Sequence, residues 1–487
     1  MLAPIHRLPV EKLTEIFSFY SSCHKDLPLE LLWVCRSWRG VALTIPHIWS
    51  NVCLGTWTKV EKVAFILDRT AVSPLYVEID TDADAVPFKI VGAHESPQYA
   101  GLVLAATQAK RWRSVTIISS PPEYHIGTAE HLKTLPLVFN GPLEGLQSFK
   151  IKRTWHDTAI LLLGDITFPH DKITDIELSS LNALYHYAQP QFATIFRALI
   201  IFKVEVQLMS TAVDILAHFQ QLETLDAWGL CLPTYPVETD LQLVHTLKYM
   251  KINNISVQWM AGRTFPNLKE CEIIQPLHPE MIVLGYSVNL PVCTKFTYDN
   301  NTINTLPNFC IPILDILTIR SNVSHKDIGS RQLAAVWSGA PGEAALLKPR
   351  ILHLDTQCHE RHLIEALSML PELEELHLRV IHPDGLGQMF FTSLQAEEEM
   401  GCNTQAVTHV CRLCPSLKSL SICYSFWVPD GTPDEITPLL HQLVKLRQKT
   451  NMALQSVKFW HIKERVQDTG PWASPLRSDP WLSLCCD

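Results

Sequence analysis

Two histidines in the chain have the types, though not the spacing, of zinc ligands. His359 and His362 occur in the segment CHERHL. Zinc-dependent hydrolases place their two imidazoles four residues apart in H-E-x-x-H, so that both reach one ion from one helical face. Here the two histidines are three residues apart, and no third ligand follows at an obvious distance. The spacing therefore favours surface or loop histidines over a metal centre.

Cysteines offer a second possible metal site. Cys411 and Cys414 form C-x-x-C, with Cys402 and Cys423 nearby, which is half of the spacing of a zinc site. We expect Cys411 in a helix that leads to a strand, and Cys414 in the turn between the two, where a small apolar side chain packs well. At the C-terminus, Leu484 stands four from the end where prenylation needs a cysteine. We predict no metal and no lipid at these positions.

Catalytic motifs give no stronger signal. The chain has no GxSxG, P-loop or GxGxxG sequence, and Gly385-Leu386-Gly387 is only a fragment of the last. We therefore predict no catalytic residues, no cofactor and no active site. The alternative, an enzyme that uses the histidines between His353 and His382, predicts stoichiometric metal in the purified protein.

Composition limits the class of protein. The 487 residues are 47% hydrophobic and 18% charged, with a net charge of −9, and no basic stripe is present. Nucleic-acid and membrane-surface proteins usually carry a basic excess, so we predict neither partner. Apolar runs such as 159–163 are far shorter than the roughly 20 residues of a membrane span. The N-terminus has no signal-peptide pattern, and 14 cysteines scattered singly suit a reducing compartment. We expect a cytoplasmic or nuclear protein.

The N-terminal residues 8–49 have the pattern of a small helical unit. A first helix is predicted to begin just before Pro9, with one apolar stripe formed by Leu13, Ile16, Phe17 and Tyr20. After a break at 21–28, a second helix is predicted from Leu29 to about Ala42. Two short helices cannot enclose this much apolar surface by themselves. Either another protein covers it, or the unit caps the domain that follows.

The motifs LP-x-E-x-L-x-x-IF and LLWVCRSWRG-x-A, followed by Trp49, resemble the F-box. Members of that family dock on the Skp adaptor of a cullin-RING ubiquitin ligase, while the rest of the chain holds a substrate. The segment 21–25 is longer than the usual inter-helix turn of the family. The resemblance implies adaptor contacts at Leu8, Pro9, Ile16, Phe17, Leu32, Val34, Cys35 and Trp38.

A Leu-rich hexad, L-x-x-L-x-L in its ideal form, recurs through the remaining chain. Its copies are LQSFKI at 146, ITDIEL at 173, FRALII at 196, LETLDA at 222, LKYMKI at 247, LKECEI at 268, CTKFTY at 293, LDILTI at 314, PRILHL at 349, LEELHL at 373, LKSLSI at 417 and LQSVKF at 454. Between Phe149 and Leu317 the middle positions lie 21 to 27 residues apart. This period is typical of leucine-rich repeats.

The hexad predicts a short strand that buries one face and cannot do so alone. Stacking such units would give a solenoid, and the pattern resembles the irregular leucine-rich repeats that commonly follow F-boxes. We therefore predict an α/β fold with an N-terminal helical F-box and a leucine-rich-repeat horseshoe of parallel strands and helices; an ordinary α/β domain is the alternative. Helices are expected at 209–220, 361–370, 403–414 and 433–450.

The predicted domains are an F-box-like unit at 1–55, a helical linker with a first strand at 56–110, the repeats at 111–462, and a tail or cap at 463–487. The strand face opposite the core is a candidate concave surface for a protein substrate. Its predicted residues are Asp226, Trp228, Lys251, Asn253, Asp299, Arg320, His353, Asp355, His377, Arg379 and Trp460. Mixed charge along this row favours a protein over a nucleic acid, and the alternative is a solvated face that binds nothing.

These expectations combine into one hypothesis. The chain would be the substrate-recognition subunit of a Skp-cullin-F-box ubiquitin ligase, without an active site of its own. A scaffold or regulatory protein that binds the adaptor without building a ligase is the alternative. The sequence does not identify the substrate.

Overall fold

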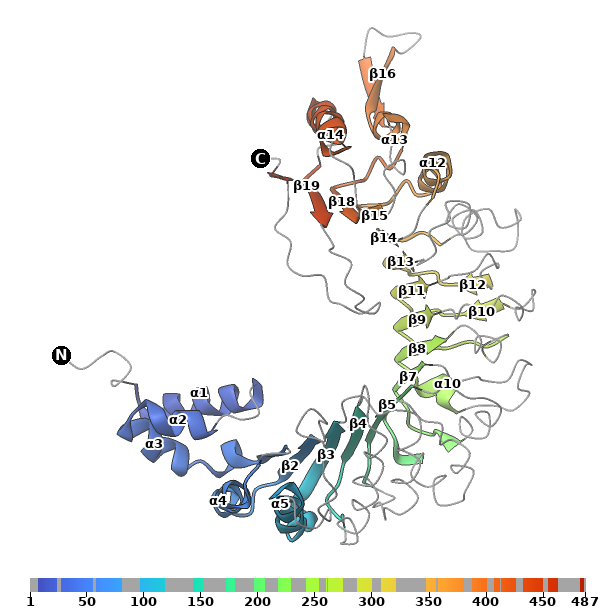
Figure 1. The fold of residues 1–487 in the computed structure, drawn as a ribbon. Coiled ribbons are helices and arrows are strands. Elements are labelled where there is room, and N and C mark those ends of the chain that lie inside the picture. Colours follow the sequence, from blue (N-terminus) through green and yellow to red (C-terminus); the bar gives the residue numbers. More distant parts are fainter. Residues whose placement is uncertain are drawn as a thin grey trace, which may run out of the picture. The chain divides into compact units, whose positions relative to one another are not determined.

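The computed structural model is an α/β protein with a large sheet of parallel strands, the fold class that the sequence predicts at this level (Figure 1). It describes residues 8–23, 28–55, 58–80, 97–118, 143–152, 172–179, 197–205, 218–228, 242–253, 260, 262–274, 287–299, 308–320, 347–355, 358–380, 388–400, 407–411, 413–425, 432–449, 454–462 and 482–485. The chain forms two compact units, Met1–Cys231 with Thr239–Thr246, and Leu232–Glu238 with Leu247–Asp487. The division falls inside the predicted repeat region.

The first unit begins with short helices. They are α1 (Val10–Cys23), α2 (Pro28–Val34), α3 (Arg36–Leu43) and the 3-10 turn η2 (Pro46–Trp49). Pro9 immediately precedes α1, and its carbonyl accepts a hydrogen bond from Leu13 N at 3.1 Å. Proline suits this boundary because its fixed φ is compatible with a helix start and it lacks only an N–H that has no helical partner there.

The predicted second helix is wrong in one respect, because the structure divides it at Cys35. This residue is extended, with φ −162° and ψ 170°, and caps α3 by accepting a hydrogen bond from Trp38 N on its Sγ at 3.5 Å. A side chain that accepts an otherwise orphaned helical N–H favours a new helix start. The apolar spacing is similar on both sides of the break, so periodicity alone does not reveal it.

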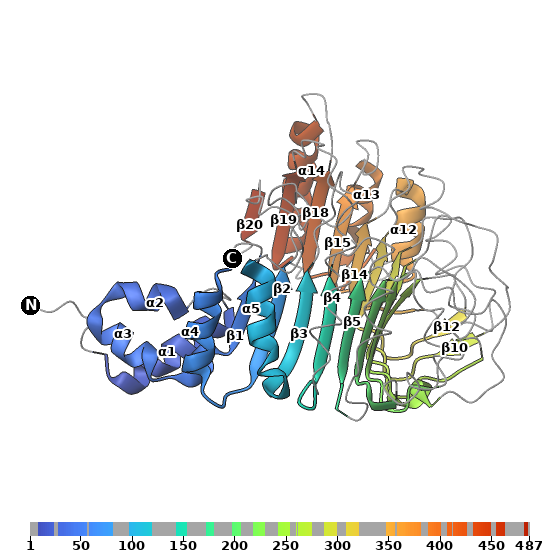
Figure 2. The ribbon, with the colours of Figure 1, turned by 60° about the horizontal axis from the view of Figure 1, so that its bottom comes forward.

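Parallel strands follow in chain order in the first unit (Figure 2). They are β1 (Asn51–Leu54), β2 (Leu75–Asp80), β3 (Trp112–Ile118), β4 (Ser148–Lys152), β5 (Asp175–Ser179), β6 (Ile201–Glu205) and β7 (Thr224–Trp228). The helices α4 (Val60–Thr70) and α5 (Pro97–Ala106) pack together, η4 (Ala109–Arg111) precedes β3, and α10 (Leu243–Thr246) also belongs to this unit.

The second unit continues the same pattern of parallel strands. Its main strands are β8 (Tyr249–Asn253), β9 (Glu270–Ile274), β11 (Lys295–Asp299), β13 (Ile316–Arg320), β14 (Ile351–Asp355), β15 (Glu375–Val380), β18 (Ser419–Ser425) and β19 (Ser456–Ile462). The helices are α12 (Glu360–Ser368), α13 (Gln388–Ser393) and α14 (Thr432–Lys449). Two small sheets pair β10 (Ser287–Asn289) with β12 (Asn308–Cys310), and β16 (Ala396–Met400) with β17 (Val407–Cys411).

Each predicted hexad except FRALII at 196 lies at a strand, and the middle apolar residues are in register from strand to strand. The prediction at 196 is wrong by three residues, because β6 begins at Ile201 and Phe202, not Leu199, pairs with Ile176 and Leu225. In the second unit, for example, Phe296 pairs with Leu317 and Leu352 with Leu376, and all four are at most 2% exposed. The backbone just before each strand is linked in the same way, as in Asp315 N to Thr294 O at 2.9 Å. Burying an aliphatic or phenyl side chain stabilises a fold by about 1.5–3 kcal/mol, so these apolar rows are the main source of cohesion between neighbouring strands.

The predicted helices have mixed outcomes. Those at 361–370 and 433–450 are confirmed as α12 and α14. The predicted helix at 403–414 is wrong, because β17 lies there and pairs antiparallel with β16. Most of 209–220 lies outside the described residues. Part of the predicted tail forms β20 (Leu482–Cys485), which pairs antiparallel with β19. In the part of the chain that the structure describes, no helix is both long and apolar enough to span a membrane.

Candidate protein-binding surfaces

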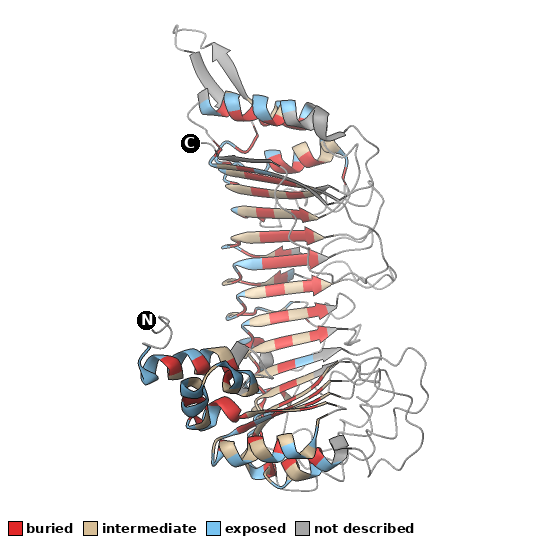
Figure 3. Cartoon of the chain, turned by 60° about the vertical axis from the view of Figure 1, so that its left-hand side comes forward, coloured by how far each residue is buried: buried red, intermediate tan, exposed pale blue. Residues whose placement is uncertain are grey.

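The helices α1 and α2 present large apolar side chains to solvent (Figure 3). On α1, Ile16 is 45% exposed and Phe19 is 73% exposed. On α2, Trp33 is 84% exposed and Val34 is 54% exposed. Several large apolar side chains are thus exposed between residues 16 and 34, and exposed apolar surface commonly marks a binding site for another macromolecule. These four residues, here called the helical surface, are the first candidate site.

The orientation of α1 corrects one predicted contact. Phe17 is fully buried, so it offers no surface to a partner, and its ring packs edge-on against Trp38 at 5.0 Å between centroids. Trp38 is half-buried, and its Nε1 lies buried without a hydrogen-bond partner among the described residues. An unpaired buried donor costs about 1–3 kcal/mol.

The remaining predicted adaptor residues differ in accessibility. Leu8 and Pro9 are exposed just before α1, whereas Leu32 is half-buried on α2. Cys35 is half-buried and caps α3, so a structural role accounts for its presence. Phe19 and Trp33 were missed by the sequence prediction; Trp33 stands inside the quoted motif, but the α-helical spacing of its neighbours did not distinguish it from core residues.

The helices are fixed to the strands that follow them by buried and polar contacts. Trp49 is fully buried, donates from Nε1 to Ala42 O at 2.9 Å and packs edge-on against Phe65 of α4. Ser18 Oγ and His47 Nε2 lie 2.6 Å apart, which ties α1 to η2. These contacts join α1, α3 and η2 to one another and to α4.

The polar face of the strands in the first unit carries alternating charges. In register from β4 to β7 stand Lys150, Glu177, Lys203 and Asp226. Lys150 Nζ lies 2.8 Å from Asp175 Oδ2 and 3.9 Å from Glu177 Oε2. Asp226 is thus on the predicted face. The sequence prediction named nothing from β4 to β6, although the same hexad alternation would have found these residues.

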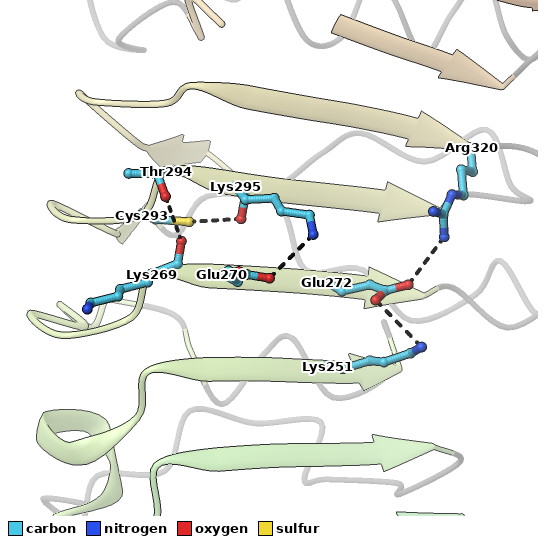
Figure 4. Close-up of polar contacts among 8 residues, drawn as sticks. All are labelled: Lys251, Lys269, Glu270, Glu272, Cys293, Thr294, Lys295 and Arg320. Atoms are coloured by element: carbon cyan, nitrogen blue, oxygen red, sulfur yellow. Dashed lines mark hydrogen bonds and ion pairs between the residues drawn. The ribbon is translucent and has the colours of Figure 1, made fainter. Parts of the chain in front are cut away.

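In the second unit, Lys251, Glu272 and Arg320 form a cluster that is linked by ion pairs (Figure 4). Lys251 and Arg320 were predicted from the sequence, and Glu272 was not. Glu272 Oε2 lies 3.5 Å from Lys251 Nζ, and Glu272 Oε1 lies 3.4 Å from Arg320 Nη1. Arg320 is on β13 and Glu272 on β9, so the guanidinium reaches past the intervening strand β11. The Glu272 carboxylate thus forms ion pairs with both Lys251 and Arg320.

The cluster is bordered by two further contacts. Lys295 Nζ lies 3.4 Å from Glu270 Oε2, as Figure 4 shows. On β14 and β15, Arg379 Nη1 lies 3.2 Å from Asp355 Oδ2. The predicted residues Lys251, Arg320, Asp355 and Arg379 therefore stand on one polar face. Lys251 and Arg320 pair with Glu272, and Asp355 pairs with Arg379.

Two histidines stack on this face. The rings of His353 and His377 are 4.3 Å apart between centroids with an interplanar angle of 26°, and the two residues are in register on β14 and β15. Burial lowers the pKa of His353 to about 4, with His377, Arg320 and Lys295 adding to the shift and Glu375 opposing it. The His353 ring is therefore uncharged at pH 7.

For four predicted residues the structure does not describe whether the side chain lies on the polar face of the strands. Trp228, Asn253, Asp299 and Trp460 lie on strands of the structure, but their side chains are outside its described part. Trp228 belongs to the first unit with Asp226, so these two residues and those of the second unit are not treated as one site.

The candidate metal ligands do not form a centre among the described residues, where no group of three or more suitable side chains is found. His359 caps the start of α12, and its ring lies 6.0 Å from that of His362. Cys414 is buried with φ 47°, and its Sγ donates to Leu367 O at 3.6 Å. Cys411 lies on β17 and not in a helix.

Comparison with known proteins adds no assignment. No family model matches the chain, and no curated protein matches it significantly.

Proposed function

We propose that this chain is an F-box substrate receptor, whose N-terminal helices dock on a Skp-type adaptor and whose strands form a leucine-rich-repeat solenoid that binds a protein substrate. The observation that carries the proposal is the helical surface, which stands inside the segment with the F-box-like motifs. The in-register hexads support the repeat assignment, because each strand buries its apolar row against its neighbours.

The proposed mechanism is proximity. Adaptor, cullin and ubiquitin-carrying subunits would perform the transfer, and this chain would hold the substrate beside them. Tethering two proteins on one frame raises the effective concentration of the acceptor lysine without any catalytic group in the receptor. The proposal thus needs neither cofactor nor metal, and it places the protein in the cytoplasm or nucleus, away from membranes and nucleic acids.

Co-expression with a Skp-type adaptor tests the proposal. Wild type should co-purify with the adaptor, and Val34→Asp should abolish co-purification because a carboxylate would be buried in an apolar interface. Val72→Asp is the matched control, since Val72 is 91% exposed in the turn after α4, outside the helical surface. Failure of wild type to bind, or equal loss in both variants, would contradict the proposal.

A non-ligase scaffold is the second candidate, because an exposed apolar surface fits any adaptor-binding protein. The two functions differ in whether a cullin joins the complex. Recovery of a cullin with wild type and adaptor supports the receptor, and stable adaptor binding that excludes the cullin supports the scaffold.

A further inference from the structure

Within the second unit, Glu375 differs from the other carboxylates described on its face. Glu270, Glu272 and Asp355 each lie within 3.5 Å of a lysine or arginine nitrogen. Glu375 instead lies beside a histidine, with 3.5 Å between its Oε2 and His377 Nε2. Its side chain is 42% exposed and that of His377 is 33% exposed, so a partner can reach both.

The stacked rings of His353 and His377 make an aromatic support beside this carboxylate. Because the His353 pKa is far below 7, that ring adds no positive charge of its own near neutral pH. On the far side of His377 the register places Ser421, and next to Glu375 it places Ser419. Both side chains are small, and Ser421 is only 4% exposed, so a partner reaches the stack through the exposed part of His377.

Three cations of this chain in the surroundings pair with other carboxylates, and a fourth stands two strands away. Arg320 pairs with Glu272 and Lys295 with Glu270. Arg350 has its nitrogens on Asp315 and Glu374. Its pKa is raised mainly by Asp315 and to a smaller extent by Glu374 and Glu375, so Glu375 feels this cation without forming an ion pair with it in the described part of the chain. Lys458 is two strands from His377 in register, about 10 Å away at the usual strand spacing. A carboxylate beside a flat ring thus remains available to an external cation.

We propose that Glu375 and the His353–His377 stack form a subsite for an arginine side chain of the protein partner. A guanidinium is planar, stacks on aromatic faces and matches a carboxylate with two parallel N–H donors, whereas a lysine ammonium matches neither feature as well. The inference rests on the proposed function in so far as the strand face binds a protein, and it names one side chain of that protein.

The test uses the full chain without the adaptor, so that its outcome is independent of the docking experiment. The probes are the capped peptide Gly-Arg-Gly and its citrulline twin, which keeps the shape of arginine and removes the charge. Saturation-transfer NMR at pH 7.5 should give a Kd of about 1 mM for the arginine peptide, and binding of the citrulline peptide should be about fivefold weaker.

Variants assign the binding to the site. Glu375→Gln and His377→Asn should each lower the affinity for the arginine peptide to the affinity that wild type has for the citrulline peptide. Glu365→Gln removes the same charge from exposed α12 and should leave binding unchanged. Equal binding of the two peptides, no binding by wild type, or equal effects of Glu375→Gln and Glu365→Gln would overturn the proposal; thermal unfolding confirms that each variant is folded.

Discussion

The helices α1 and α2 and the strands of the second unit present opposite kinds of surface. The helices present Ile16, Phe19, Trp33 and Val34, apolar groups for which exposure to water is unfavourable. The strands present charged side chains that are mostly matched by neighbours, as in the cluster around Glu272. A partner of the helices would gain chiefly from apolar burial, and a partner of the strands from specific polar contacts.

The largest expected effect concerns a polar group that the second unit keeps inside. Arg447 of α14 is fully buried, and its guanidinium donates to Leu394 O, Leu413 O, Cys414 O and Leu417 O at 2.8–3.3 Å. Arg447→Met should lower the free energy of unfolding of this unit by about 3–5 kcal/mol, because the carbonyls lose their donor. Guanidinium unfolding curves measure the change. Arg361→Met on exposed α12 is the control, and an equal effect there would contradict the account.

A loss of similar size is expected at one of two tryptophans of the N-terminal segment. Trp49→Ala should destabilise the first unit by about 3–5 kcal/mol, since a buried indole and its hydrogen bond to Ala42 O are lost. Trp33→Ala should change its stability by less than about 0.5 kcal/mol, because the side chain is 84% exposed. Thermal unfolding compares the two variants. Similar losses would mean that Trp33 is part of the core.

A smaller effect is expected from the charged cluster on the strands. Glu272→Gln removes the carboxylate that pairs with Lys251 and Arg320. It should lower the free energy of unfolding by about 1 kcal/mol or less, and by a smaller amount at high salt. Denaturant midpoints at two ionic strengths give the measurement. A cost of several kcal/mol that salt does not alter would show that the cluster supports the fold and is not a surface network.

A further effect depends on pH. The pKa of His353 is about 4 in the folded chain, below the ordinary 6.5. Between pH 6.5 and 4 the unfolded chain therefore binds a proton at this residue and the folded chain does not. Wild type should therefore lose stability relative to His353→Gln as pH falls from 7 to 5. Thermal unfolding of both proteins across this range measures the difference. A constant difference would contradict the lowered pKa.

The sequence predicted the strands well because the hexad is a local pattern. In Leu-x-x-Leu-x-Leu the alternation itself determines which side chains face the core. Strands such as β15 and β18 can therefore be predicted without knowing which distant residues they contact. The hairpin β16–β17 was missed because Ala396–Met400 is rich in glutamate and has no apolar alternation. Arg447 could have been found, since it follows Leu440, Leu443 and Val444 at helical spacing on the buried side of α14.

Sequence reasoning was weaker for the helical surface. Leu13, Ile16, Phe17 and Tyr20 form one broad stripe, and the stripe does not say which edge of it faces the core. The contact between Phe17 and Trp38 of another helix decides this, so Phe17 turns inward and Ile16 outward. The break at Cys35 likewise depends on a cap that periodicity cannot detect.

Titration of a purified Skp-type adaptor into the full chain tests the central claim most directly. Isothermal calorimetry should detect saturable binding by wild type and by Val72→Asp. The double variant Ile16→Asp, Val34→Asp should bind at least about 100-fold more weakly, a loss of about 2.7 kcal/mol. Absence of binding by wild type, or equal affinity of the double variant and the control, would contradict the account.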